Sequence, residues 1–86
     1  MKQLKTIYAA SGETLKVTNQ WAAECEKRSA TVSSSAWEMS DGSSVTGSLS
    51  GTAATATITP TGCGWLKNTV TLANGEVLIG CRKVEV

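Results

Sequence analysis

The chain has 86 residues, of which eight are basic and seven acidic, and it contains no histidine. The formal net charge of +1 is too small for electrostatic capture of nucleic acid or of an anionic membrane surface. The lack of histidine removes the usual general base and the commonest metal ligand, so the composition argues against an enzyme.

The first residues, 1–12, are interpreted as an N-terminal arm or an edge strand ahead of a single domain over residues 13–86. Gly12 separates them from the alternating part of the chain, which favours the arm. They lack the continuous apolar run of about 7–15 residues that a signal peptide needs. No stretch approaches the roughly 20 apolar residues of a membrane helix. We therefore expect a protein that stays in the cytosol or leaves it inside a larger assembly.

A strand is predicted from Thr14, because the residues alternate between two faces. One face has Leu15, Val17, Asn19, Trp21 and Ala23, and the other has Lys16, Thr18, Gln20 and Ala22. A period of two is typical of a strand with one covered face. A helix is the alternative for residues 19–27, which are rich in Ala, Glu, Lys and Arg, but no capping residue closes it. We interpret the charged residues 24–28 as a turn.

Three more strands are expected in the middle of the chain. Residues 30–39 are interpreted as one interrupted strand or two short ones, and residues 44–50 follow after a turn signal at residues 41–42. In residues 53–59 every second residue is threonine, so this strand has one apolar face and one hydroxyl face. Pro60 ends it, because proline lacks the N–H that a ladder needs.

The final strands, residues 65–72 and 77–86, form the clearest hairpin of the chain. They are joined at Asn74-Gly75, which predicts a type I′ turn. Gly80 is interpreted as a bulge, since the apolar residues on its two sides differ in parity.

Six to seven strands with turns every 8–12 residues and no reliable helix predict an all-β fold, an antiparallel β-sandwich. The expected core draws on every strand of the domain: Leu15, Val17, Trp21, Val32, Trp37, Met39, Leu49, Ala56, Ile58, Leu66, Val70, Leu72, Val77, Ile79 and Val84.

The three cysteines do not form a metal-binding pattern. Cys25, Cys63 and Cys81 lie 38 and 18 residues apart, whereas a structural zinc site takes four ligands, commonly as close pairs. We expect no metal and no cofactor. The odd number indicates free thiols, with Cys63 in a loop and Cys81 in the core, in phase with Ile79.

Six motifs follow one another along the chain: a strand ending in tryptophan, a second strand with tryptophan, a Thr-rich strand, a Thr-Val-Thr strand, a glycine turn and a terminal strand. They are Trp21, Ser35-Ala36-Trp37, residues 53–59, Asn68-Thr69-Val70-Thr71-Leu72, Asn74-Gly75 and Val84-Glu85-Val86. Over roughly residues 14–86 this order resembles that of small structural proteins of tailed bacteriophages. The chain departs from the pattern in its short loop 61–64, its Asn-Gly turn and its three cysteines.

The resemblance implies an immunoglobulin-like sandwich and a virion component without an active site, made in the cytoplasm of the bacterial host. Its expected partners are capsid or tail proteins, as for a capsid-decorating or head/tail accessory protein, and a homo-oligomer is one mode of assembly. Neither nucleic acid nor membrane is an expected partner.

The alternative function is that of a carbohydrate- or cell-surface-binding immunoglobulin-like module, and a third is a small inhibitor or regulator. The candidate contact residues are Trp65, Asn68 and the threonines Thr55, Thr57 and Thr59. Trp65 follows a glycine-containing loop, and tryptophan is favoured at interface hot spots. The other two tryptophans are expected to be buried, which argues against a sugar site built by aromatic stacking.

Overall fold

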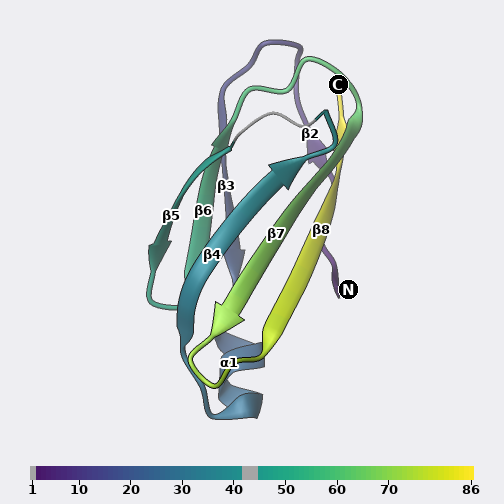
Figure 1. The fold of residues 1–86 in the computed structure, drawn as a ribbon. Helices are drawn as coiled ribbons and strands as arrows, with labels where there is room; N and C mark the ends of the chain where they lie inside the picture. Colours follow the sequence, from purple (N-terminus) through teal and green to yellow (C-terminus); the bar gives the residue numbers. More distant parts are fainter. Residues whose placement is uncertain (1, 42–44) are drawn as a thin grey trace.

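The computed structural model describes residues 2–41 and 45–86, which form two sheets and one short helix (Figure 1). The predicted turn at residues 41–42 and the start of the predicted strand 44–50 fall partly on residues 42–44, outside the described part. The elements are β1 (Lys2–Gln3), β2 (Ile7–Tyr8), β3 (Leu15–Gln20), α1 (Ala22–Arg28), β4 (Val32–Met39), β5 (Thr46–Ser50), β6 (Ala53–Ile58), β7 (Gly64–Leu72) and β8 (Val77–Glu85).

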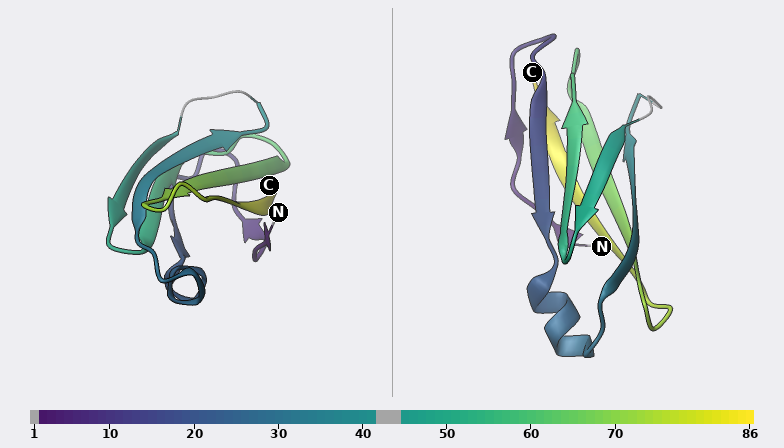
Figure 2. Two further views of the ribbon diagram at one scale, coloured as in Figure 1. Left: turned by 60° about the horizontal axis from the view of Figure 1, so that its bottom comes forward. Right: turned by 90° about the vertical axis from the view of Figure 1, so that its left-hand side faces the viewer.

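The strands are divided between two sheets. The first has the order β1–β8–β7–β4, with β2 pairing further along the same edge of β8, and the second has the order β3–β6–β5. Because β1 and β2 share one edge position, the described residues fill four strand positions in the first sheet and three in the second. This confirms a mainly β fold of two sheets. A purely antiparallel arrangement was wrong, because β1 and β2 run parallel to β8. The first sheet curves into a half-barrel (Figure 2).

Within the predicted N-terminal segment, residues 2–8 lie along the first sheet, where β1 and β2 are short edge strands. The N–H of Leu4 donates to the carbonyl of Cys81 at 2.8 Å, directly after β1. Gly12 does not separate an arm from the domain. It has a φ of 82°, a conformation that glycine adopts without strain, and it turns the chain from β2 towards β3.

The alternating patterns of β3 and β6 are confirmed. In β3, Val17 and Asn19 are buried while the residues between them are exposed. In β6, Ala54, Ala56 and Ile58 are buried and the threonines face the other way. The strand expected to be interrupted is one element, β4, with an irregular register near its start.

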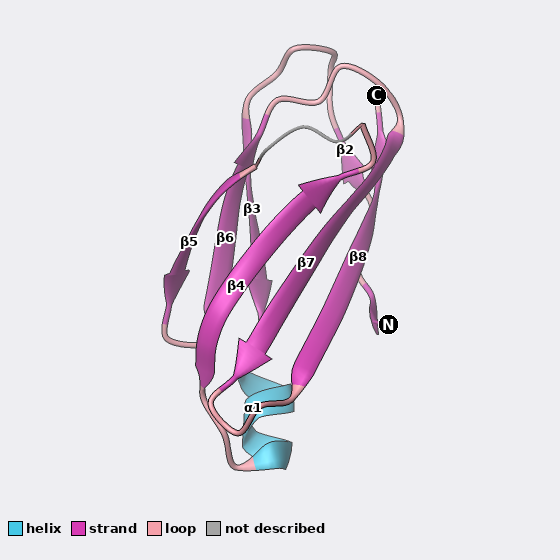
Figure 3. Cartoon of the chain, in the orientation of Figure 1, coloured by secondary structure: helices cyan, strands magenta, loops and turns pink. Residues whose placement is uncertain are grey.

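The charged segment that was predicted as a turn is the helix α1 (Figure 3). Its residues are good helix formers, with Glu24 in the first turn and Lys27 and Arg28 in the last, where they complement the helix dipole. Ser29 ends it in the left-handed conformation, with a φ of 50°. The strand pattern concealed this helix because β3 runs almost directly into it and Trp21 makes no side-chain cap.

The hairpin between β7 and β8 is confirmed, but its turn is not of type I′. Gly75 has a φ of 92°, whereas Asn74 keeps a negative φ. The N–H of Leu72 donates to the carbonyl of Glu76 at 2.8 Å, so three residues, 73–75, form the loop. This is the geometry of a type I turn followed by a left-handed glycine.

The extra loop residue changes which face each residue of β8 takes, because a shift of one residue in register reverses the faces of a strand. Val77, predicted in the core, is 55% exposed, and Ile79 and Cys81 lie on the outer face. Leu78 packs against the core instead. Leu49, also predicted in the core, is 37% exposed because β5 is an edge strand.

Gly80 is not a bulge, since the ladder between β7 and β8 runs through it without a shift. A Cβ at Gly80 would lie 3.0 Å from Cη2 of Trp21 and 2.8 Å from Cδ1 of Leu4. The glycine therefore makes room for the buried indole of Trp21.

We expect Gly80→Val to lower the free energy of unfolding by about 1–3 kcal/mol, the usual cost of overpacking a core. Urea denaturation followed by circular dichroism measures this. Gly62→Val is the matched control, because a Cβ at Gly62 would meet nothing within 4 Å. Equal losses in the two variants would mean that close packing against Trp21 is not the reason for the glycine.

Two apolar clusters fill the space between the sheets, and the second includes a residue of α1. The first contains Val17, Met39, Ala56, Ile58, Leu66 and Val84, and the second contains Trp21, Cys25, Ala54, Val70 and Leu72. Trp37 is partly buried and contacts both clusters.

A buried amide links the two sheets. The side chain of Asn68, on β7, is fully buried and has four hydrogen bonds. Its Oδ1 accepts from Nδ2 of Asn19 at 3.2 Å and from Nε1 of Trp21 at 3.0 Å. Its Nδ2 donates to Oγ of Ser35 at 2.9 Å and to the carbonyl of Ala36 at 3.0 Å. Asn68 therefore fixes β3, β4 and β7 relative to one another.

Arg82 extends this network to the edge of the second sheet. Its Nε donates to Oδ1 of Asn19 at 2.9 Å, and its Nη2 donates to the carbonyl of Thr18 at 3.1 Å. Its Nη1 donates to the carbonyl of Lys5 at 3.1 Å. Burial lowers the pKa of the Arg82 guanidinium. The side chain closes the seam between β3 and the N-terminal segment.

Candidate interaction surfaces

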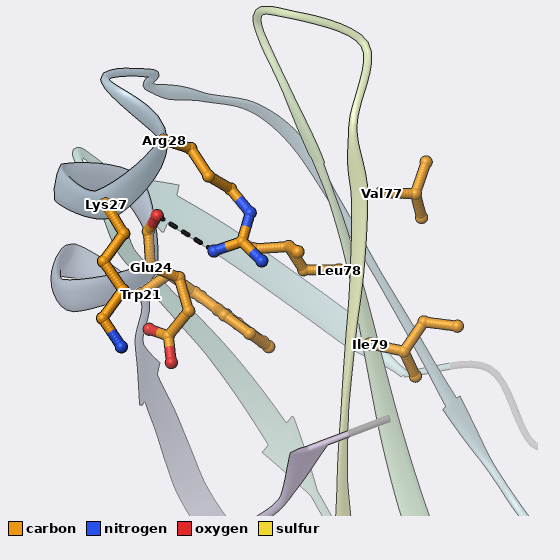
Figure 4. Close-up of a pocket in the computed structure, with 7 residues that line it drawn as sticks. All are labelled: Trp21, Glu24, Lys27, Arg28, Val77, Leu78 and Ile79. Atoms are coloured by element: carbon orange, nitrogen blue, oxygen red, sulfur yellow. Dashed lines mark hydrogen bonds between the residues drawn. The ribbon is translucent and has the colours of Figure 1, made fainter.

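A groove of about 490 Å³ lies between α1 and the first residues of β8 (Figure 4). The side chains of Trp21 and Leu78 point into it, whereas those of Val77 and Ile79 point to the other side of β8. Seven residues line this α1–β8 groove: Trp21, Glu24, Lys27, Arg28, Val77, Leu78 and Ile79.

Basic side chains of the last turn of α1 form one wall of the groove. Arg28 is held in place, because its Nε donates to the carboxylate of Glu76 at 3.0 Å and its Nη1 donates to the carbonyl of Glu24 at 3.3 Å (Figure 4). Lys27 is exposed on the same turn. The wall therefore presents the ammonium group of Lys27 and the carboxylate of Glu24 beside an apolar floor.

The other wall is a stretch of sheet edge without a neighbouring strand. In the described residues β1 pairs with β8 from Gly80 onward, so residues 77–79 have a strand neighbour, β7, on one side only. Backbone groups alternate in direction along a strand, and the carbonyl of Cys81 points to the β1 side, where it accepts from Leu4. Val77 therefore directs its N–H and C=O towards the groove, which suits an added extended chain.

Trp65, predicted as a partner contact, lies on the outer face of the first sheet and is 38% exposed. The ammonium of Lys67 lies 5.9 Å from the centre of its ring, within range of a cation–π interaction. Glu38 approaches the same ammonium at 3.9 Å. Trp65 is therefore accessible, with charged neighbours.

Asn68 does not belong to any surface. It was predicted as a contact together with Trp65, but its side chain is fully buried and every one of its hydrogen-bonding groups is used internally. The sequence did indicate that Asn68 is buried, because it is in phase with the apolar residues of β7.

The threonines Thr55, Thr57 and Thr59 lie on the outer face of the second sheet or just beyond it. Thr55 shares a hydrogen bond of 3.0 Å with Thr18, and Thr59 shares one of 3.1 Å with Thr14. Thr57 borders a hollow of about 180 Å³. Because Trp65 is on the outer face of the opposite sheet, no single small ligand touches both parts of the predicted set.

The cysteines are free thiols, and Cys25 is buried, Cys63 exposed and Cys81 intermediate. Cys81 was expected in the core and lies on the outer face, for the same reason of register as Ile79. Over residues 2–41 and 45–86, no three His, Cys, Asp or Glu side chains gather as metal ligands would. In the same residues, no helix has the length and apolarity to cross a membrane.

The α1–β8 groove was not predicted from the sequence, because two assignments of residues that line it were wrong. The helix was interpreted as a turn, and Val77 was assigned to the core. The alternative interpretation of residues 19–27 as a helix, which rested on their helix-forming composition, was correct for one of these walls.

No family model matches the chain, and no curated protein matches it.

Proposed function

We propose that the protein is an immunoglobulin-like sandwich. In that fold, strands B, E and D lie in one sheet and strands C, F and G in the other. The order β3–β6–β5 corresponds to B, E and D, and β4, β7 and β8 correspond to C, F and G. In the constant-type arrangement the first strand, A, lies beside strand B. Here the first strands, β1 and β2, pair with β8 instead of β3.

The protein acts as a non-enzymatic structural or accessory component of a tailed-phage virion. It is made in the cytoplasm of the bacterial host and docks on capsid or tail proteins by protein–protein contact. The motif order of the sequence supports the phage assignment. The near-neutral charge supports docking by shape and hydrogen bonding rather than by long-range attraction.

The observation that carries the docking function is the α1–β8 groove. It combines an unpaired stretch of sheet edge, an apolar floor and an exposed ammonium, and these are the elements that a domain uses to take up an extended segment. The occupant that fits best is an extended segment of a particle protein, with an apolar side chain for the floor and a carboxylate for Lys27.

Co-sedimentation with purified particles of the source phage tests this function. We expect the wild-type protein to sediment with the particles and Lys27→Glu to bind about tenfold more weakly, since reversal of the charge removes an attraction of about 1.4 kcal/mol. Lys5→Glu is the matched control, because Lys5 is exposed on the loop between β1 and β2, outside the groove.

A wild-type protein that never sediments with heads or tails would refute the virion function. Binding that is equal in the Lys27→Glu and Lys5→Glu variants would keep the function but exclude the groove as its contact.

A further inference from the structure

The sandwich protects its strand edges unequally. An open edge exposes N–H and C=O groups that pair with other chains unless charges, bulges or neighbouring segments cover it. Arg82 bonds to the carbonyl of Thr18 on the edge of β3, and β1 and β2 cover most of β8. β4 carries a charged residue, Glu38, and an irregular register near its start.

β5 has none of these protections in the described part of the chain. All five of its residues are exposed, none is charged and none is proline. It pairs with β6 on one side only. Of the strand edges in the described residues, β5 is therefore the one best suited to accept another strand.

The direction of the backbone groups of β5 follows from its neighbours. The N–H of Trp21 donates to the carbonyl of Thr52 at 2.9 Å, so even-numbered residues of β6 point towards β3 and odd-numbered ones towards β5. Thr46, Ser48 and Ser50 are opposite those odd-numbered residues and use their backbone groups within the sheet. The two residues between them, 47 and 49, direct two N–H and two C=O groups to the open edge.

We propose that β5 pairs with β5 of a second copy of this chain, antiparallel about a two-fold axis at Ser48. In this register Gly47 lies opposite Leu49 of the partner subunit, and four hydrogen bonds satisfy every open-edge group of both strands. The two three-stranded sheets become one continuous sheet of six strands. The inference does not depend on which particle the protein binds.

The side chains fit the same register. Gly47 and Leu49 lie opposite the buried Ala56 and Ala54, so they are on the inner face of their sheet. A Cβ at Gly47 would lie 2.6 Å from Cδ1 of Trp37, so the indole occupies the space beside this glycine. Leu49 of the partner subunit, opposite Gly47, packs over that space, and its own exposed surface of 37% in the monomer becomes covered.

The composition of β5 also favours a like copy as the occupant. Antiparallel pairing with itself brings no like charges opposite each other, because the strand has no charge. A five-residue edge gives an interface at the small end of the known range, so the dimer is weak and forms at high local concentration. Such a concentration arises where many copies assemble on one surface.

Sedimentation equilibrium over about 10 µM to 1 mM measures the association, a range that corresponds to dissociation constants of weak complexes. We expect the weight-average mass to rise above the monomer value of 8.9 kDa towards twice that value. Leu49→Lys, which places two like charges at the pairing edge, should weaken the association at least tenfold. Thr57→Lys adds the same charge on the neighbouring strand β6, away from the edge, and should associate like the wild type.

Hydrogen exchange of the wild-type protein gives an independent measurement that needs no variant. The amides of Gly47 and Leu49 should exchange more slowly as the protein concentration rises, while that of Ser48 should not change. A mass that stays at the monomer value at 1 mM overturns the proposal, and so does a Leu49→Lys variant that associates as strongly as the wild type. Exchange at Gly47 and Leu49 that is independent of concentration while a dimer forms also overturns it.

Discussion

Asn68→Ala is expected to lower the free energy of unfolding by about 3–5 kcal/mol, because it removes four hydrogen bonds at the centre of the protein. Nε1 of Trp21 and Nδ2 of Asn19 lose their buried acceptor, and a buried group without a partner costs about 1–3 kcal/mol. A domain of this size has a total of about 4–13 kcal/mol at typical values per residue. The variant is therefore expected to be near the limit of folding.

Two further variants separate the hydrogen bonds from the loss of volume. Asn68→Leu fills most of the space but still leaves the donors of Trp21 and Asn19 without an acceptor, so it should recover less than half of the lost stability. Ser35→Ala removes one of these bonds, the one to a partly buried hydroxyl, and should cost about 1 kcal/mol. Urea denaturation followed by circular dichroism measures all three variants. Full recovery in Asn68→Leu would show that packing, not hydrogen bonding, is the role of this amide.

The strands could be predicted from the sequence wherever one face of the strand is buried and the other is exposed to solvent. In β3 and β6 every second residue is buried, so the period of two is complete, and the threonines of β6 reveal its exposed face. The hairpin of β7 and β8 was also predictable, because Asn74-Gly75 forms turns without strain. These are local properties, and they depend on few residues at a time.

The faces of β8 could not be predicted, because they depend on the number of residues in one loop. Asn-Gly is compatible with a two-residue turn and with a three-residue loop, and the two place Val77 on opposite faces. The three-residue loop lets Gly80 meet the indole of Trp21, and a contact between residues so far apart in the chain leaves no local signal.

The interior position of Asn68 was hidden for a related reason. Its hydrogen-bond partners, Asn19, Trp21, Ser35 and Ala36, lie 32 to 49 residues away in the sequence. A polar residue in a strand is expected on the solvent-exposed face unless buried groups form hydrogen bonds with its side chain. For Asn68 those groups come together only when both sheets have formed. Of the candidate contact residues on β7, Trp65 is therefore accessible to a partner and Asn68 is not.

Trp21→Ala is the second variant with a large expected effect. The indole is 2% exposed, and removal of a buried tryptophan side chain costs about 3–5 kcal/mol through lost transfer energy and the cavity that remains. For a domain of fewer than 100 residues this corresponds to a fall in the melting temperature of at least about 12 °C. Circular dichroism during thermal unfolding measures it. Trp65→Ala is the matched control, because the exposed Trp65 should contribute about 1 kcal/mol or less.

A double-mutant cycle with Asn68 tests whether Trp21 acts through packing alone. Trp21→Phe keeps an aromatic ring beside Gly80 but removes the N–H that bonds to Oδ1 of Asn68 at 3.0 Å. If that bond stabilises the contact between the sheets, the losses in Trp21→Phe and Asn68→Ala will overlap, and the double variant will lose at least about 0.5 kcal/mol less than their sum. Strict additivity would mean that the two side chains stabilise the protein independently, and that the buried amide is held by Asn19, Ser35 and Ala36 without the indole.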